Sequence, residues 1–392
     1  MDKHDPVTAM KARWSYIQPY LFPFLRQEID PLTAKLEKLI YALDTIGLEA
    51  YVRAETGGGP GRPRDDRRAI ARAFVAKAIL GLPSTTALRE RLLVDASLRR
   101  ICGWERRAEI PSEPTFSRAF NEFAEEGLVE RIHRALVERS FEGRIVGVVA
   151  RDATEIEARE KPAPKDDDPP PPPAPPRKAG RPRKDEPAPP RNPSRLERQP
   201  GQTLAQMTAE LPTRCDVGTK KNSKGFKESW TGYKAHIDVV CGQVPVSLLL
   251  TSASLHDSQA AIPLMTMTSG RIDYLYEVMD AAYDAEILHQ HSRTLGHVAV
   301  IDPNFRADRA RKDEWAAETK RRNLINMPDF DDILYDFRTM AERVNARLKD
   351  AFGGRTVRVP GAVKVKCHLM FGILALTADQ LIRLFNPQPL PA

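Results

Sequence analysis

The sequence has few cysteines, no long hydrophobic run and no export signal. Its four cysteines lie far apart and form no C-x-x-C pair, which argues against a zinc site or a disulfide framework and favours buried thiols in a reducing compartment. The longest apolar run, residues 368–378, is too short to span a bilayer. The N-terminal segment lacks a basic stretch followed by an apolar core. We therefore expect a soluble, cytoplasmic protein with no membrane partner.

What the sequence does have is length and a modest positive charge. A chain of 392 residues can form two domains with a sizeable core. Its 60 basic and 53 acidic side chains give a net charge of +7 and a pI near 9.2. This balance favours a polyanionic partner such as nucleic acid, although an excess of this size is weak support by itself.

Hydrophobic spacing predicts that the N-terminal third is helical. Clustered aromatics before residue 25 indicate a short packed arm, and residues 30–51 place leucine and isoleucine at helical spacing. This first region, residues 1–60, packs either on its own domain or on a second subunit. Residues 61–143 predict further helices, with Ser84 and Ser112 as N-caps.

Basic outer faces on these helices favour a helix-turn-helix-like DNA-binding bundle. The segment after Ser112 places three phenylalanines inward and leaves Arg118 outward. A helical domain that only supports the next domain is the alternative interpretation.

The pattern changes at Arg144, where a β-branched run predicts a buried strand that delivers Asp152 at its C-terminal end. Residues 160–217 then form an insertion with five consecutive prolines and almost no aliphatic residues in its first part, so we expect it to be disordered. Within it, "RKAGRPRK" resembles an AT-hook, which implies that Arg181 and Arg183 follow the narrow minor groove of A·T-rich DNA. A solvated charge run is the alternative.

Strands and helices alternate after the insertion. The expected strands cover residues 230–240, 245–254, 272–280 and 297–304. With the first strand, this order is that of a mixed α/β, ribonuclease-H-like domain spanning residues 144–385, in which the first and fourth strands are neighbours. Residues 361–384 predict a C-terminal helix packed on this domain.

Residues 332–349 predict a helix with an unusual polar face. Tyr335, Arg338, Glu342 and Lys349 stand at offsets that bring them within a stripe about 60° wide. A column of this kind suggests a ligand that carries several negative charges, with the carboxylate reserved for a metal.

Three carboxylates are placed to converge: Asp152, Asp280 and Glu342. Hard divalent cations such as Mg²⁺ prefer carboxylate oxygens. Two such ions about 3.5–4 Å apart can activate an attacking oxygen and stabilise the leaving one at a phosphodiester. Each acid also has an ordinary explanation. Asp152 can be a turn residue, Asp284 competes with Asp280 but is better placed to cap the next helix, and Glu342 can form surface ion pairs on its own helix.

The motifs "RDAT", "MDAAYDAEIL" and Y-(2)-R-(3)-E-(6)-K resemble those of bacterial insertion-sequence transposases of the DDE (Asp-Asp-Glu) class, and the likeness covers nearly the whole chain. Ala281 and Ala282 depart from the Lys-Gly that often follows the second acid. The resemblance implies that Asp152, Asp280 and Glu342 are catalytic ligands of two Mg²⁺ ions, for which Mn²⁺ can substitute. It also implies a nucleoid-associated homodimer that binds the inverted repeats at element ends and transfers them to target DNA.

The same resemblance implies DNA contacts around this centre. Arg338 and Lys349 would bind phosphates, and Tyr335 would bind a phosphate or stack on a base. The lysines expected along the DNA path, unless they form only a solvated loop, are Lys220, Lys221, Lys224, Lys227 and Lys234.

Other polar residues are open to two interpretations. His256 and Asp257 support the metal ligands or, in the simpler interpretation, cap a helix, and His289 and His291 have little support as metal ligands. Two other functions stay open: a catalytically inactive, transposase-derived DNA-binding regulator, and a nuclease without preference for element ends.

Overall fold

The computed structural model describes residues 32–52, 65–164, 192–221, 224–305, 309–325, 327 and 334–385. The predicted N-terminal arm and the AT-hook-like element with Arg181 and Arg183 lie outside these ranges.

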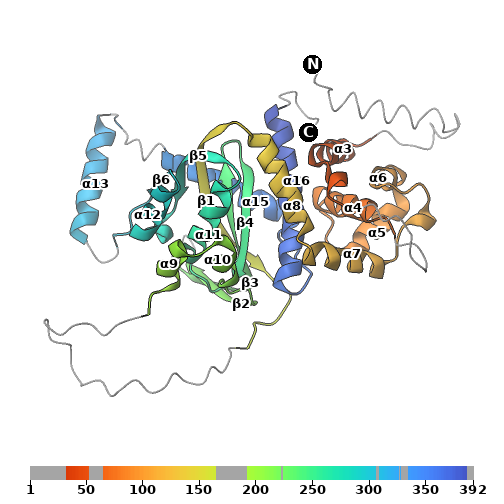
Figure 1. Ribbon diagram of the computed structural model, residues 1–392, viewed down its shortest axis with the longest axis horizontal. Coiled ribbons are helices and arrows are strands. Elements are labelled where there is room, and N and C mark those ends of the chain that lie inside the picture. The colour runs from red at the N-terminus through yellow and green to blue at the C-terminus, as the bar shows by residue number, and fades with distance from the viewer. Residues whose placement is uncertain are drawn as a thin grey trace.

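Every regular element described before residue 142 is a helix (Figure 1). The helix predicted for residues 30–51 is α3 followed by a short 3₁₀ turn at Leu48–Ala50. The Ser84 hydroxyl accepts a hydrogen bond from the Ala87 amide at 3.0 Å, which confirms this predicted cap. Ser112 occupies the N-cap position of its helix without capping it through its side chain. The α-helices are α3 (Ala34–Ile46), α4 (Arg67–Ile79), α5 (Thr85–Val94), α6 (Ala96–Cys102), α7 (Glu113–Glu125) and α8 (Leu128–Phe141).

These helices share one hydrophobic core with the rest of the chain. The phenylalanine stripe of α7 points inward as predicted, and its ring at Phe120 lies 5.1 Å from Phe74 of α4. Phe371 of the C-terminal helix α16 (Ala362–Phe385) lies 5.4 Å from Phe74. Helix α3 packs on α4 and α16, so it is held by its own chain. The helical part is therefore built around α16, which also covers β4 of the sheet.

The sheet has six strands in the order β2-β3-β1-β5-β6, and β4 pairs with the far half of β3. β1 runs antiparallel to β3 and parallel to β5, and β5 runs parallel to β6, so the sheet is mixed. The predicted first and fourth strands are β1 and β5, and they are neighbours as expected. The strands are β1 (Ile145–Glu157), β2 (Asp216–Lys221), β3 (Lys227–Val240), β4 (Val244–Ser252), β5 (Asp273–Met279) and β6 (Val298–Ile301).

Helices flank both faces of this sheet. α11 (Ser258–Ser269) packs on β3 and β4, and α12 (Glu286–Thr294) packs beside β6. α15 (Thr339–Ala351) lies against β1 and β3. The mixed sheet with flanking helices is consistent with a ribonuclease-H-like domain, as the order of elements predicted.

The C-terminal helix is a core helix. Among the described residues, α16 alone has the length and composition of a membrane span, but 89% of its most apolar window is buried within the protein. This agrees with the prediction that the C-terminal helix packs on the domain. The predicted buried thiols are also found: Cys102, Cys215 and Cys367 are buried and free, and Cys241 is partly exposed.

Three expectations about the elements were wrong, and one further helix, α13, was not predicted. β1 does not end at Asp152 but runs on to Glu157, because β3 continues to pair with it. The predicted disordered insertion, residues 160–217, extends too far along the chain. Residues 192–217 include α9 (Arg195–Arg198), a 3₁₀ turn at Gln199–Gly201, α10 (Leu204–Ala209) and the start of β2. The polar segment before the last catalytic helix contains helix α13 (Arg309–Leu324). The last catalytic helix is interrupted by a 3₁₀ turn at Asp336–Arg338 before α15 begins.

Candidate active site

Two predicted acids lie on adjacent parallel strands. Asp152 lies within β1, and Asp280 directly follows the last residue of β5. The register that pairs Ala150 with Val278 places the two acids at the same end of the strand pair. Because the carboxyl ends of parallel strands share one edge of a sheet, the fold itself brings these acids together.

Helix α15 reaches this edge from the sheet face that it covers. The Asn345 side chain of α15 donates a hydrogen bond from Nδ2 to Asp152 Oδ2 at 3.0 Å. One turn earlier on the same helix stands Glu342. α15 therefore both anchors one strand acid and presents the third predicted acid beside it.

Burial and neighbouring carboxylates raise the pKa values of both strand acids. Burial raises the pKa of Asp152 to about 6, and repulsion from Asp280 and Glu342 adds to this rise while Arg338 opposes it. Burial also raises the pKa of Asp280, helped by repulsion from Asp257 and Asp302. Asp280 and Glu342 are thus both near enough to Asp152 to contribute to its raised pKa.

Glu342 points to a cation of its own helix. Its Oε1 lies 2.5 Å from Arg338 Nη2, and half of its side chain is exposed. Arg338 also lies 5.6 Å from the centre of the Tyr335 ring. The surface ion pair that the sequence left open is thus formed.

Among the described residues, no three His, Cys, Asp or Glu side chains stand close enough to form a metal site. The donors still fit a hard divalent cation in kind: they are partly buried carboxylates with raised pKa values. Glu342 would have to exchange Arg338 for the metal.

Three of the predicted DNA-contacting lysines form ion pairs with carboxylates of the protein. Lys349 Nζ donates to Glu155 of β1 at 2.7 Å, and Lys220 pairs with the same carboxylate at 3.0 Å. These ion pairs outweigh the effect of burial and lower the pKa of Glu155 to about 2. Lys234 instead binds Asp257 at 2.8 Å.

Three other predicted DNA contacts, Lys224, Lys227 and Arg118, lie on the surface. Lys224 and Lys227 are exposed at the turn that joins β2 to β3, and Lys221 ends β2. Arg118 is exposed on α7 and donates to the Thr115 hydroxyl at 3.2 Å.

Two predicted helix caps were wrong. Asp257 occupies the N-cap position of α11, but its side chain binds Lys234 and caps no backbone amide. Asp284 does not cap α12, whose N-cap is Ala285; its Oδ2 accepts a hydrogen bond from the Asn304 amide at 2.7 Å. In each case a partner distant in sequence takes the carboxylate from the nearby helix end.

The histidines of α12 and the His256 side chain have local partners. His291 Nε2 lies 3.2 Å from the Thr266 hydroxyl, and burial lowers its pKa. His289 lies 3.8 Å from Asp284, and His256 Nδ1 lies 2.9 Å from the Ser258 hydroxyl.

The turn after the second acid is held by backbone. Asp280 Oδ1 accepts a hydrogen bond from the Ala282 amide at 2.9 Å, which starts the 3₁₀ turn Ala281–Tyr283. The alanines that depart from the family pattern thus still orient Asp280, but they bring no cation to it.

Sequence reasoning missed three residues of this centre. Asp302 follows β6 beside the end of β5, and its amide donates to the Met279 carbonyl at 3.4 Å. Its position after a parallel strand was a usable signal, because Asp280 was found in the same way. Asn345 and Glu155 had no such signal, since their partners lie on β1 and α15, nearly 200 residues apart in sequence.

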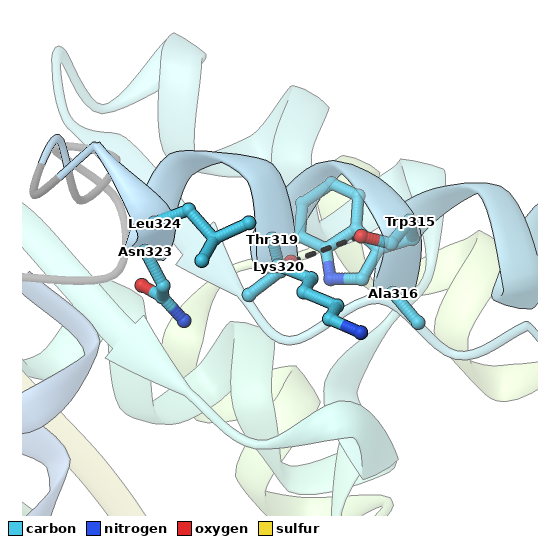
Figure 2. Close-up of a pocket in the computed structure, with 6 residues that line it drawn as sticks. All are labelled: Trp315, Ala316, Thr319, Lys320, Asn323 and Leu324. Carbon is cyan, nitrogen blue, oxygen red and sulfur yellow. Dashed lines mark hydrogen bonds between the residues drawn. The ribbon is translucent and has the colours of Figure 1, made fainter.

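A hollow on α13 lies on another element (Figure 2). It is lined by Trp315, Ala316, Thr319, Lys320, Asn323 and Leu324. All of these residues belong to one helix, and none of the predicted site residues lies among them, so this hollow carries no part of the acid centre.

A mixed sheet flanked by helices, with acids on or directly after two neighbouring strands and a third on a flanking helix, is consistent with a ribonuclease-H-like domain. The family model described as "Transposase DDE domain" matches residues 147–378, more than half of the chain and the whole stretch from Asp152 to Glu342. A second model, "Transposase domain (DUF772)", matches residues 24–122. The chain therefore belongs to the DDE transposases of insertion sequences. No curated protein sequence matches it significantly.

Proposed function

We propose that this transposase binds the inverted repeats at the ends of its own insertion sequence, cuts there and joins the freed 3′-hydroxyl to target DNA. One observation supports the proposal: the register of β1 and β5 puts Asp152 and Asp280 at the same end of the strand pair, and Asn345 of α15, one turn from Glu342, binds Asp152. Metal-dependent cleavage of DNA needs this combination of oxygen ligands and a nearby cation.

Asp152, Asp280 and Glu342 would hold two Mg²⁺ ions, for which Mn²⁺ can substitute. When bound, such ions activate the attacking oxygen and stabilise the leaving one. Asn345 holds Asp152 by its Oδ2. Arg338, once released from Glu342, can bind a DNA phosphate through two N–H groups, with Tyr335 packed against the guanidinium.

The DNA path would follow the cations around this centre. Lys220 and Lys349 meet at Glu155 on one side of the acids, and Lys234 lies on another beside Asp257. The helical part would contact the element end, with Arg118 on its exposed surface. Because two ends must be held together, we propose a homodimer in the DNA complex, acting on the nucleoid in the cytoplasm.

The test is cleavage of a duplex that carries the inverted repeat flanking the gene. The wild-type chain should bind this duplex and, with Mg²⁺ or Mn²⁺, release a 3′-hydroxyl at the element end. Asp280→Ala and Glu342→Gln should bind and not cut. Full strand transfer by either variant would contradict the proposal. Binding without any metal-dependent cutting by the wild type would favour the inactive regulator, and cutting without preference for ends would favour a nuclease.

A further inference from the structure

A second ion cluster lies directly behind the acid centre and is sealed from solvent. The Arg151 guanidinium donates from Nε and Nη2 to the two oxygens of Asp238, each at 2.8 Å. Its third nitrogen, Nη1, donates to Glu277 Oε2 at 3.0 Å. The side chains of Arg151, Asp238 and Glu277 are 0% exposed.

This cluster joins three adjacent strands, two of which carry Asp152 and lead to Asp280. Arg151 belongs to β1, Asp238 lies directly opposite it on β3, and Glu277 belongs to β5. Arg151 Nη1 also lies 3.2 Å from the sulfur of Met279. Arg151 directly precedes Asp152 in the sequence, and Met279 directly precedes Asp280. The contact between Arg151 and Met279 therefore joins the two strands next to both acids.

The cluster is also tied to the helix behind the sheet. The Thr268 hydroxyl of α11 donates to Asp238 Oδ2 at 2.6 Å, and its oxygen lies 2.8 Å from the Ser247 hydroxyl. Asp238 therefore accepts from two directions and cannot turn without breaking bonds. Consecutive residues of a strand point to opposite faces. Arg151 faces α11 through this cluster, and Asp152 faces α15 through Asn345.

Net stability does not explain such a cluster. Replacing a buried ion pair with apolar residues of similar size is often neutral or stabilising, because desolvation offsets the attraction. A planar guanidinium bound by a two-point fork does, however, accept only one relative position of its partners. The gain is geometrical: the cluster fixes where β1 and β5 stand relative to each other.

We propose that Arg151, Asp238 and Glu277 are positioning residues that set the separation of Asp152 and Asp280 for divalent-cation binding. This inference rests on the proposed function. The guanidinium fork holds β1 against β3 and β5 at the level of the two acids. Two metal ions about 3.5–4 Å apart need their shared ligands at a fixed spacing, and a loosened strand pair widens or varies that spacing.

The test measures Mn²⁺ binding by electron paramagnetic resonance on the full chain without DNA, next to binding of end DNA in EDTA. The variants are Arg151→Lys, which keeps the charge and loses the fork, and Glu277→Gln. Thr268→Val removes only one supporting bond and is the mild variant that should remain folded. The control is Thr377→Val, which removes buried hydrogen bonds to His133 and Pro245 between α16, α8 and β4.

We expect Arg151→Lys and Glu277→Gln to weaken Mn²⁺ binding at least tenfold, and Thr268→Val two- to threefold, while end-DNA affinity stays within twofold. The control should lower the melting temperature without changing Mn²⁺ affinity. The positioning role is wrong if Arg151→Lys, Glu277→Gln and Thr268→Val bind Mn²⁺ as tightly as the wild type, or if Thr377→Val loses as much Mn²⁺ affinity as they do. Either result leaves the proposed function standing. If the wild type itself binds no Mn²⁺ and cuts no DNA, the proposed function fails and takes this inference with it.

Discussion

Arg151 and Asp152 are neighbours in sequence, yet they belong to opposite kinds of environment. On the α11 face of the sheet, Arg151 is fully buried and each of its charged contacts is matched by a carboxylate. On the α15 face, Asp152 stands among other carboxylates, and burial and repulsion raise its pKa to about 6. The difference teaches how to find a ligand site in this fold. On the α11 face one guanidinium binds two carboxylates directly and joins three strands; on the α15 face Asp152 is bound by the Asn345 amide, and we propose that a divalent cation binds it there.

On the α15 face, removing one acid should have the largest effect on DNA cleavage. Asp280→Asn keeps the size of the side chain and its hydrogen bond from Ala282 but loses a ligand charge. We expect cleavage of end DNA to fall by about 1,000-fold or more, the size of effect that a few kcal/mol of lost transition-state stabilisation gives. Single-turnover cleavage in Mg²⁺ measures it. A rate within tenfold of the wild type would show that Asp280 is no ligand.

On the α11 face, removing the cation should have the largest effect on stability. Arg151→Met leaves Asp238 and Glu277 buried without a partner, so we expect a loss of about 3–5 kcal/mol in the free energy of unfolding. Arg338→Met, which removes the exposed pair with Glu342, should cost under about 1 kcal/mol. Urea denaturation in EDTA gives both values. Equal losses would erase the contrast between the two faces.

The pH dependence of stability should sharpen the comparison. Burial raises the pKa of Asp152 from 3.8 to about 6, so the folded protein holds this proton more tightly than the unfolded chain. The stabilisation is complete below about pH 3.8 and is lost as the pH rises through 6. In EDTA at pH 8, Asp152→Asn should therefore melt at a higher temperature than the wild type. A lower melting temperature would contradict this sign. Divalent metal should restore the wild type, because it binds the charged form.

The smallest expected effect is on DNA binding by the lysine pair beside the α15 face. Glu155 occupies both Lys349 and Lys220, and a DNA phosphate has to compete with it. Glu155→Gln should therefore bind random-sequence duplex a few-fold more tightly, with a steeper dependence on salt. Glu157→Gln, at the exposed end of the same strand, is the matched control. Weaker binding by the Glu155 variant alone would mean that Glu155 presents the lysines to DNA rather than competing for them.

The order of strands and the positions of Asp152 and Asp280 could be read from the sequence because they depend on local signals. A strand run followed by an acid predicts a strand end, which holds at Asp280 but fails at Asp152, because β3 keeps pairing with β1 as far as Glu157. The same logic misled at Asp284 and Asp257, where a local helix cap was expected and a distant residue took the side chain instead. Short-range rules do not register such long-range competition.

The buried network was missed for a related reason. Arg151 was read as part of a motif around Asp152, and Asp238 and Glu277 were passed over inside apolar strands. Charged residues within buried strands are a signal in themselves, because each needs a partner. Sequence alone does not say which partner, since the register that sets Arg151 opposite Asp238 joins residues 87 positions apart.

The central claim is that the acids on the α15 face bind divalent metal ions and that these ions support DNA cleavage. The most direct measurement is Mn²⁺-dependent cleavage of a duplex carrying the element's inverted repeat, by the wild type and by Glu342→Gln at equal DNA occupancy. The account predicts cutting at the element end by the wild type in Mn²⁺, none in EDTA, and none by the variant under either condition. Equal cutting by the wild type and the variant in Mn²⁺ would contradict it.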